Sequence, residues 1–170
     1  MTTVRRDLHR HVESNPGVHF NELTRDLDIA TGQAQYHLDR LLDGGRLATE
    51  RLRGRTHYFP SGYDPIERRT LALLRRETVR EIIVYALEHG EPSAAKLAAE
   101  LDVARSTVSW HVSTLVDAGL AEKRYDAQGR THIALTHPSK TEAMLTEVKP
   151  SLPDKLVDRF TRLVDASFPD

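Results

Sequence analysis

The stretch Leu101–Thr136, LDVARSTVSWHVSTLVDAGLAEKRYDAQGRTHIALT, combines the signals of a helix with those of a β-hairpin. Its apolar residues Val108, Val112 and Leu115 recur at helical spacing, and Gly119 ends that pattern. The residues that follow alternate in polarity around the turn DAQG, which predicts two antiparallel strands. A helix therefore leads directly into a two-stranded ribbon.

Two further helices are predicted before this stretch. Apolar residues from Val79 to Leu87 fall on one helical face, and the pattern stops at Gly90. Ser93 is a suitable N-cap for a short helix that ends near Leu101. The order helix, helix, turn, helix and two-stranded ribbon is that of a winged helix-turn-helix domain, in which the ribbon is the wing.

The same pattern occurs once more, nearer the N-terminus. The tetrapeptide GRTH stands at both Gly54–His57 and Gly129–His132. LDIA at residues 27–30 aligns with LDVA at residues 101–104, and YHL at residues 36–38 aligns with WHV at residues 110–112. Internal similarity spread over this length indicates a duplicated module.

Three local features of the copies can be predicted from this alignment. Asn21 is the expected cap of the short helix in the first copy. Val18–Phe20 is expected to form a short strand that pairs with the first wing. In both wings, strand alternation predicts that the threonine of GRTH faces inward and that its arginine and histidine project outward.

These patterns predict a mostly α protein with small β-wings, of the α+β class. It consists of two tandem winged helix-turn-helix domains and C-terminal helices. The expected boundaries are residues 1–62 for the first domain, 63–76 for a linker helix, 77–137 for the second domain and 138–170 for the C-terminal helices. Neither Gly nor Pro occurs between Pro65 and His89, so we expect the linker helix to continue into the second domain.

Composition excludes several classes of protein. The 170 residues include no cysteine, which rules out disulfides, zinc fingers and thiol catalysis. No apolar run approaches the roughly 20 residues of a membrane span, and the N-terminal segment MTTVRRDLHRH carries charges where a signal peptide is apolar. We expect a soluble, cytoplasmic protein that does not associate with membranes.

The net charge of −1 hides an uneven distribution of charge. Residues 1–60 carry nine Lys and Arg against eight Asp and Glu, and residues 61–76 carry four against two. Residues 77–137 carry six against nine. The basic surplus therefore lies in the first copy and the linker, and for binding a polyanion the local stripe of charge matters more than the total.

In a helix-turn-helix domain the third helix lies in the major groove of DNA, and the wing follows the backbone or the minor groove. Residues on the solvent side of the third helices are Gln33, Gln35, Tyr36 and Arg40 in the first copy and Arg105, Ser106, Thr107, Ser109, Trp110 and Ser113 in the second. The wings add the cations Arg51, Arg53 and Arg55, and Lys123, Arg124 and Arg130. Glutamine side chains can read adenine, and arginine and serine can hold phosphates.

The segments STVSWHVSTLVDAGL and GRTHIAL, with TGQAQYHLDRLLDGGRL and GRTHYF in the first copy, carry a family resemblance. Over residues from about 3 to 137 the chain resembles winged helix-turn-helix transcriptional regulators of the ArsR/MarR-like superfamily, and archaeal two-module regulators in particular. The resemblance implies that the helices at residues 31–43 and 105–117 enter the groove, and that terminal helices build a dimer. The matching apolar stripe is Leu156, Phe160, Leu163 and Val164.

The sequence thus predicts a sequence-specific, double-stranded DNA-binding transcriptional regulator that acts as a homodimer and uses no cofactor. An alternative is a tandem winged-helix protein-interaction module of a transcription or chromosome-organising complex, which the acidic balance of residues 77–137 favours.

The sequence gives less support to two other classes of function, a metal sensor and an enzyme. A metal sensor using the histidines of the first copy lacks cysteine ligands and tight ligand spacing. These histidines are His9, His11, His19, His37 and His57. An enzyme is not indicated, because no Gly-rich phosphate loop or catalytic cluster is visible. The sequence identifies neither an operator nor a small-molecule effector.

Overall fold

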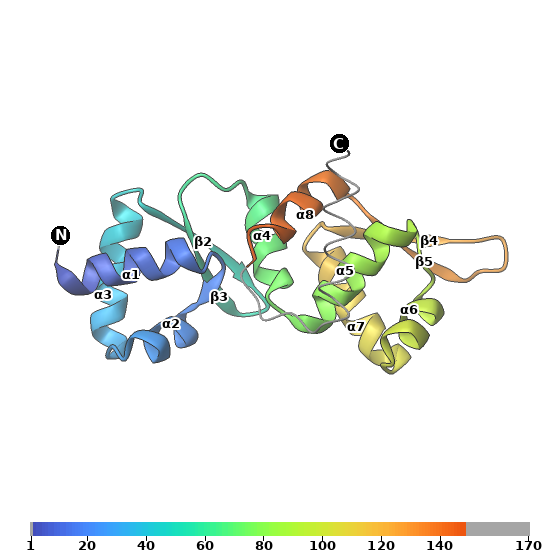
Figure 1. Ribbon diagram of the computed structural model, residues 1–170, viewed down its shortest axis with the longest axis horizontal. Helices are drawn as coiled ribbons and strands as arrows, with labels where there is room; N and C mark the ends of the chain where they lie inside the picture. Colours follow the sequence, from blue (N-terminus) through green and yellow to red (C-terminus); the bar gives the residue numbers. More distant parts are fainter. Residues whose placement is uncertain (1, 149–170) are drawn as a thin grey trace. The chain divides into compact units, whose positions relative to one another are not determined.

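The computed structural model describes residues 2–148 of the chain. These residues form two compact units, each of which contains one copy of the repeated module (Figure 1). One unit comprises the chain up to Ala72 together with the segment from Met144, and the other includes Leu73–Ala143. The predicted dimer stripe of Leu156, Phe160, Leu163 and Val164 lies outside the described residues.

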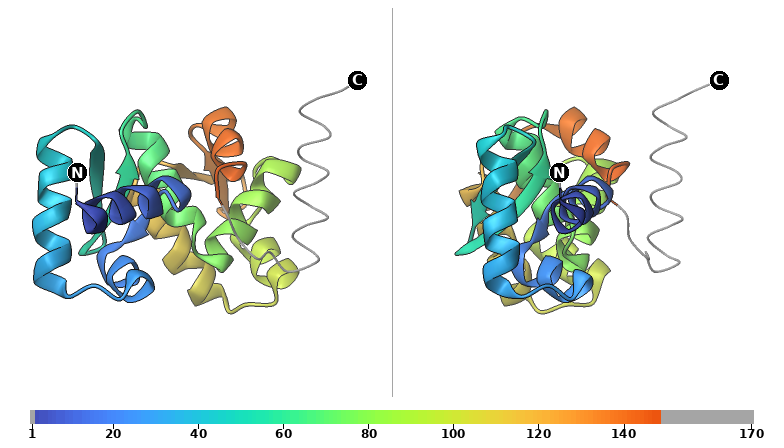
Figure 2. Two further views of the ribbon diagram at one scale, coloured as in Figure 1. Left: turned by 60° about the vertical axis from the view of Figure 1, so that its left-hand side comes forward. Right: turned by 90° about the vertical axis from the view of Figure 1, so that its left-hand side faces the viewer.

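The first unit has the predicted order of helices and strands. Its elements are α1 (Thr3–Ser14), β1 (Val18–His19), α2 (Phe20–Leu27), α3 (Thr31–Asp43), β2 (Leu47–Leu52) and β3 (Arg55–Pro60). The strands form an antiparallel sheet in the order β1-β3-β2, and α1 packs against α2, α3 and β3 (Figure 2). The expected pairing of the short strand with the wing is confirmed, because Val18 pairs with Tyr58 and His19 pairs with His57.

Apolar side chains from all of these elements form the core of the first unit. The buried cluster is Leu8, Val12, Val18, Leu23, Leu38, Leu41, Leu47 and Tyr58. Burying a leucine side chain stabilises a fold by about 1.5–3 kcal/mol, so this cluster supplies much of the folding free energy of the small unit. It also fixes which face of α3 remains in solvent.

The tight turn between the two helices of each helix-turn-helix pair is the same in both copies. Asp28 and Asp102 end α2 and α6 with left-handed backbone angles, φ 50° and φ 53°. Aspartate is one of the few residues with a Cβ that adopts this conformation readily. The repeated sequence Leu-Asp-Ile/Val-Ala therefore encodes a repeated turn.

The predicted cap of the second short helix is confirmed, but that of the first is wrong. Ser93 Oγ accepts a hydrogen bond from the backbone N–H of Lys96 at 3.1 Å. In the first unit the cap is His19, whose Nδ1 accepts from the backbone N–H of Glu22 at 3.4 Å. Asn21 lies inside α2, because strand β1 ends at His19 and the helix begins at the next residue.

The second unit repeats the plan. It contains α5 (Glu77–His89), α6 (Ala94–Leu101), α7 (Arg105–Asp117), β4 (Ala121–Tyr125) and β5 (Thr131–Leu135). β4 and β5 form a two-stranded antiparallel sheet, and a single bridge joins Ser93 to His132 where the first unit has β1. Its buried side chains include Val79, Ile82, Ile83, Leu97, Val108, Leu115, Leu120 and Ile133.

The expectation that the linker helix continues into the second domain is wrong. Helix α4 (Pro65–Leu74) ends at Leu74 and α5 begins at Glu77, so two residues separate the helices. The buried Arg80 side chain stabilises this break, since its Nη1 donates to the carbonyls of Leu74 and Arg75, both at 2.9 Å. These contacts satisfy carbonyls that have no partner at the end of a helix.

Helix α4 begins with a reciprocal cap. Asp64 Oδ1 accepts from the backbone N–H of Glu67 at 2.8 Å, and Glu67 Oε1 accepts from that of Asp64 at 3.0 Å. After the second wing comes α8 (Pro138–Leu145). No helix within residues 2–148 is long and apolar enough to cross a membrane.

Candidate nucleic-acid interface

Helices α3 and α7 occupy the third-helix positions of the two modules, with the bounds predicted from sequence. In α3 the side chains of Ala34, Leu38 and Leu41 are buried, and in α7 those of Val108, Val112 and Leu115 are buried. These stripes anchor each helix to its own core. The opposite face of each helix is left to solvent.

All four candidate residues of α3 are exposed. They are Gln33, Gln35, Tyr36 and Arg40. Tyr36 is 53% exposed, and the guanidinium of Arg40 lies 5.5 Å from the centre of its ring. Gln35 Nε2 donates to Asp39 Oδ1 at 2.8 Å, which orients the amide along the helix. This face combines hydrogen-bonding amides, an aromatic ring and a cation, which are the groups that contact base edges and phosphates.

The corresponding face of α7 also carries one cation, and it has hydroxyl groups where α3 has amides. Arg105, Ser106, Ser109 and Trp110 are exposed, whereas Thr107 and Ser113 are half-buried. Trp110 is 48% exposed, and the guanidinium of Arg76 lies 5.8 Å from the centre of its ring. Of the six candidate residues, only Arg105 is charged.

The first wing presents its cations to solvent. Arg51, Arg53 and Arg55 are all exposed. Within residues 2–148, no carboxylate lies within ion-pair distance of Arg51 or Arg55. The carboxylate of this wing, Glu50, lies instead against α4: its oxygens are 3.8 Å from Arg68 Nε and 3.3 Å from Arg69 Nε.

The histidine of the first GRTH segment does not project outward, contrary to the prediction. His57 is only 7% exposed, and its Nδ1 donates to the carbonyl of Gly17 at 2.7 Å. The prediction failed because both faces of β3 are covered there: the consecutive side chains of His57, Tyr58 and Phe59 are all buried. His132 makes the equivalent contact with the carbonyl of Glu91 at 2.9 Å but stays half-buried. In both modules this histidine ties the wing to the loop before the short helix.

The second wing carries the predicted cations, but two of them face carboxylates. Arg124 pairs with Glu91 and, through Nη2 at 2.8 Å, with Glu122. Arg130 Nε lies 2.7 Å from Asp126 Oδ2. Lys123 is exposed, and no carboxylate in the described part of the chain pairs with it.

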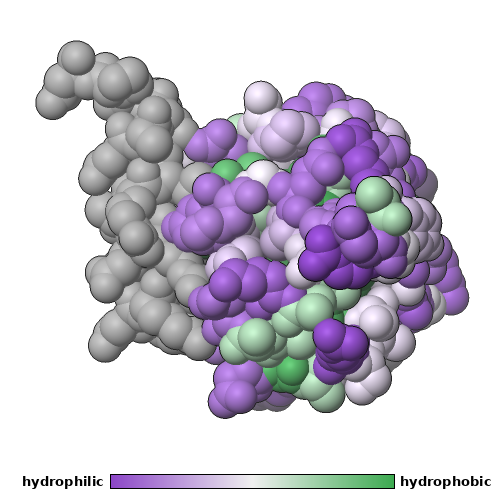
Figure 3. Space-filling model, turned by 90° about the vertical axis from the view of Figure 1, so that its right-hand side faces the viewer, coloured by the Kyte–Doolittle hydropathy of each residue, from purple (hydrophilic) through white to green (hydrophobic). Residues whose placement is uncertain are grey.

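Asp126 organises the turn of the second wing. It accepts hydrogen bonds from His132 Nε2, the Arg130 side chain and the backbone N–H groups of Gln128 and Arg130, at 2.7–2.9 Å. The His132 contact and these other donors hold the pKa of Asp126 far below its usual range. In return, Asp126 first and the Glu91 carbonyl second raise the pKa of His132. Figure 3 shows the face that carries this wing, which is mostly hydrophilic with smaller apolar areas.

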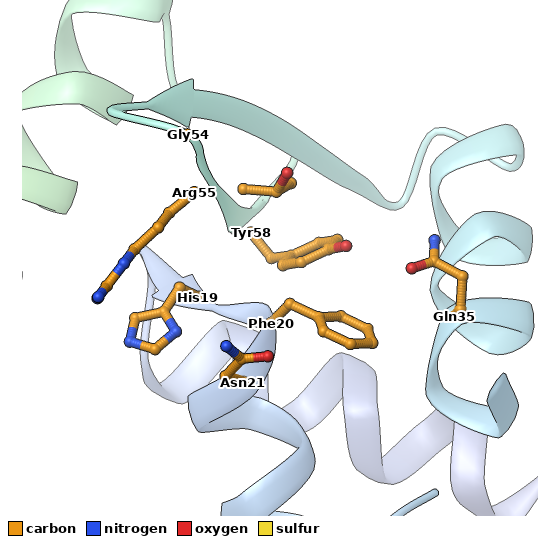
Figure 4. A pocket seen from close by; sticks show the side chains of 8 residues that line it. His19, Phe20, Asn21, Gln35, Gly54, Arg55 and Tyr58 are labelled. Atoms are coloured by element: carbon orange, nitrogen blue, oxygen red, sulfur yellow. The ribbon is translucent and has the colours of Figure 1, made fainter. Parts of the chain in front are cut away.

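A pocket connects the first wing with α3 and the start of α2. Its volume is about 270 Å³, and it is lined by His19, Phe20, Asn21, Gln35, Gly54, Arg55, Thr56 and Tyr58. In Figure 4 the rings of Phe20 and Tyr58 lie between Arg55 and His19 on one side and Gln35 on the other. The structure thus brings together two residues predicted separately, Gln35 from the helix and Arg55 from the wing. His19 and Asn21 were not among the predicted interface residues. They line the pocket because β1 pairs with β3 and α2 begins directly after β1.

The histidines of the first copy do not gather into a metal site. His9 faces Glu13 at 3.4 Å, and His11 faces Asp26 at 3.3 Å. Among residues 2–148 no group of three or more His, Asp or Glu side chains could hold a metal ion.

Comparison with known protein families identifies both modules. A family model described as an N-terminal HTH domain matches residues 2–71, and a second, described as a helix-turn-helix domain, matches residues 75–124. The chain is therefore a tandem helix-turn-helix protein, and its two wings make these domains of the winged type. Both family models describe helix-turn-helix domains.

Individual relatives are more distant. A protein of Methanocaldococcus jannaschii that bears the name of an HTH-type transcriptional regulator is 24% identical over 124 residues, which are 73% of this chain and 31% of the relative. The chain thus spans about a third of the length of this relative.

Solved structures with a similar arrangement belong to more than one class. A possible transcriptional regulator for arsenical resistance is 26% identical with a TM-score of 0.36, covering 64% of this chain and all of the other. A chain of the ESCRT-II endosomal trafficking complex is 15% identical with a TM-score of 0.35, covering 81% of this chain and 62% of the other. Both TM-scores are low, so neither similarity identifies a function for this chain.

Proposed function

We propose that this protein is a transcriptional regulator that binds double-stranded DNA in a sequence-specific manner. The observation that carries the proposal is the exposed face of the first module. There Gln35, from the exposed side of α3, and Arg55, from the first wing, line one pocket. The two helix-turn-helix domains provide the fold that uses such a face to bind DNA.

The roles of the exposed residues follow from their chemistry. Gln33 and Gln35 have amides able to read adenine in the major groove, and Arg40 has a guanidinium suited to guanine or phosphate. Arg51, Arg53 and Arg55 extend from the ribbon beside α3 and are suited to backbone phosphates. In the second module, α7 offers hydroxyl groups, Arg105 and the indole of Trp110.

A homodimer is part of the same proposal. Paired subunits bind paired half-sites, which gives a regulator both affinity and selectivity for palindromic sites. The apolar stripe at residues 156–164 is the proposed interface, on the basis of sequence. Light scattering of the full chain tests this part, and a strict monomer would count against it.

A protein-interaction module is the second candidate function. The pairing of Arg124 and Arg130 with carboxylates favours it for the second module, because neutral wings are poor binders of a polyanion. Under this alternative the chain would bind no DNA fragment in preference to others.

The two candidates are separated by selection of DNA. The full chain is incubated with fragmented genomic DNA in excess, and retained fragments are sequenced after a gel shift. We expect a small set of enriched fragments that share a motif. Uniform recovery of fragments, or no retention at low salt, contradicts the proposal and favours the interaction module.

Variants of α3 sharpen this experiment. Gln33→Ala with Gln35→Ala should flatten the enrichment while leaving low-salt binding to bulk DNA nearly unchanged, because base contacts specify and phosphate contacts position. Each base-reading contact is worth about 1–3 kcal/mol of discrimination. Thr24→Ala is a matched control, since Thr24 lies in α2 and its hydroxyl donates within that helix to the carbonyl of Asn21.

A further inference from the structure

We propose that the first wing supplies most of the wing contacts to DNA phosphates, because both arginines of the second wing pair with carboxylates of their own domain and leave Lys123 as its one cation without such a pair among residues 2–148. The proposal rests on the proposed function, and it assigns the electrostatic part of binding to one of two modules that share a fold. Three carboxylates carry it: Glu91, Glu122 and Asp126.

The strand registers show that charge is placed differently at equivalent positions. Glu50 pairs with His57 across the first wing, and Arg124 pairs with His132 across the second. Arg51 lies opposite Thr56, whereas the equivalent residue opposite Thr131 is Tyr125, whose side chain is 68% exposed. The first wing therefore directs its carboxylate toward α4 and away from Arg51 and Arg55. In the second wing both arginines are exposed as well, but each pairs with a carboxylate.

One residue outside the wing is central to this difference. Gly17 and Glu91 occupy the same position, since the carbonyl of each accepts the hydrogen bond of the GRTH histidine. Gly17 has no side chain, so it leaves the first wing unchanged. The carboxylate of Glu91 reaches back to Arg124, and Glu122 holds the same guanidinium from within strand β4.

The remaining arginine is neutralised by the turn. The backbone N–H of Asp126 pairs with the carbonyl of Arg130 at 3.1 Å, which places Asp126 where the first wing has Leu52 opposite Arg55. An apolar residue in the first wing is thus replaced by a carboxylate that pairs with Arg130 and His132. Arg55 has no such neighbour among residues 2–148, and its side chain lines the pocket beside α3.

The pairing of the arginines should affect how many counterions are released when the protein binds DNA. Affinity for DNA falls with salt by a slope of about −0.9 in log K against log [salt] for each phosphate contact by a cation. A guanidinium already held by carboxylates gains little from a phosphate, which those carboxylates also repel. Most of the wing-dependent part of the slope should therefore come from the first module.

The experiment compares three double variants of the full chain with the wild type on a 20-base-pair duplex and on a heparin column. Arg51→Gln with Arg55→Gln removes cations of the first wing. Glu122→Gln with Arg124→Gln removes an ion pair of the second wing at constant net charge. Glu91→Gln with Glu122→Gln releases Arg124. Circular dichroism checks that each variant is folded.

For the duplex, we expect the slope to become shallower by up to about 1.8 in the first variant, to stay unchanged in the second and to steepen by about 0.9 in the third. On heparin the variant without Arg51 and Arg55 should elute at lower salt than the wild type. The variant without Glu122 and Arg124 should elute with the wild type, and the variant without Glu91 and Glu122 should elute at higher salt. Asp7→Asn with Glu13→Gln, two changes in α1, controls for the gain of positive charge in the third variant.

The proposal is overturned if the second variant loses slope as much as the first, or if the third gains no more than its α1 control. The heparin arm separates this outcome from failure of the proposed function. If the wild type binds no duplex but the elution order holds, DNA binding is refuted while the charge difference between the wings stands.

Discussion

The two wings have the same backbone plan and opposite arrangements of charge. In each, a glycine with positive φ, 76° at Gly54 and 75° at Gly129, closes the turn, and the histidine three residues on fastens the strand to the loop before the short helix. The arginines are exposed in both wings, but both arginines of the second wing pair with carboxylates, whereas Arg51 and Arg55 of the first wing pair with none among residues 2–148. The shared tetrapeptide therefore specifies the structure of the wing, whereas the ability of the wing to hold phosphate depends on the residues around it.

The largest expected effect is the loss of stability when a core side chain is shortened. This loss should be confined to the unit that contains the shortened side chain. Leu38→Ala in α3 should destabilise the first unit by about 2–5 kcal/mol, because Leu38 is fully buried. Val112→Ala at the equivalent position of α7 should cost the second unit less, about 2 kcal/mol, since fewer buried carbons are removed. Urea unfolding followed by circular dichroism measures both losses.

Trp110 provides the control, because it is the single tryptophan of the chain and lies in α7. Its fluorescence therefore reports on the second unit alone. We expect Val112→Ala to move the fluorescence transition to lower urea and Leu38→Ala to leave it in place. A fluorescence transition that shifts equally in both variants would show that the two units unfold together.

A smaller loss of stability is expected when the histidine of either GRTH segment is replaced. His57→Ala leaves the Gly17 carbonyl without its partner in a buried setting and should cost about 1–3 kcal/mol. His132→Ala should lower the melting temperature by less, because His132 is half-buried and water can replace its contacts. Calorimetry of both variants checks the ranking, and an equal or reversed loss would contradict the structural difference between the two strands.

The smallest effect is a pH dependence of the second module. Asp126 and the Glu91 carbonyl raise the pKa of His132 above its ordinary value of 6.5. The stabilisation from this pair is complete below about pH 6.5 and is lost as the pH rises through the raised pKa. His111 has the opposite sign, since burial first and Arg76 second lower its pKa.

Titration of the histidine ring protons by NMR measures both groups. We expect the midpoint for His132 to lie above 6.5 and that for His111 to lie below it. In Asp126→Asn the midpoint for His132 should fall while that for His111 stays. An unchanged His132 midpoint in this variant would remove Asp126 as the cause.

Local sequence signals predicted much of the fold. The apolar stripes through Leu38 and Val112 predicted both third helices with their observed bounds, and the turn residues predicted both wings. The exposed face of α3 was also predictable, because helical geometry fixes which residues lie opposite a buried stripe. These features depend on neighbours within one or two helical turns.

Features that depend on tertiary contacts could not be predicted in this way. The break between α4 and α5 depends on a buried arginine, Arg80, that reaches back to the last carbonyls of α4. The burial of His57 depends on β1 completing a three-stranded sheet around β3. The ion pair between Glu91 and Arg124 joins residues 33 positions apart, so no local pattern indicates it.

Binding of duplex DNA through the charged face of the first module can be tested by one titration. The affinity of the wild type for an enriched genomic fragment is measured by fluorescence anisotropy between roughly 50 and 200 mM salt, beside the double variant Arg51→Gln with Arg55→Gln. We expect tight binding that weakens steeply with salt in the wild type, and weaker binding with a shallower slope in the variant. Binding that is absent, or that has the same affinity and slope in both proteins, would contradict it.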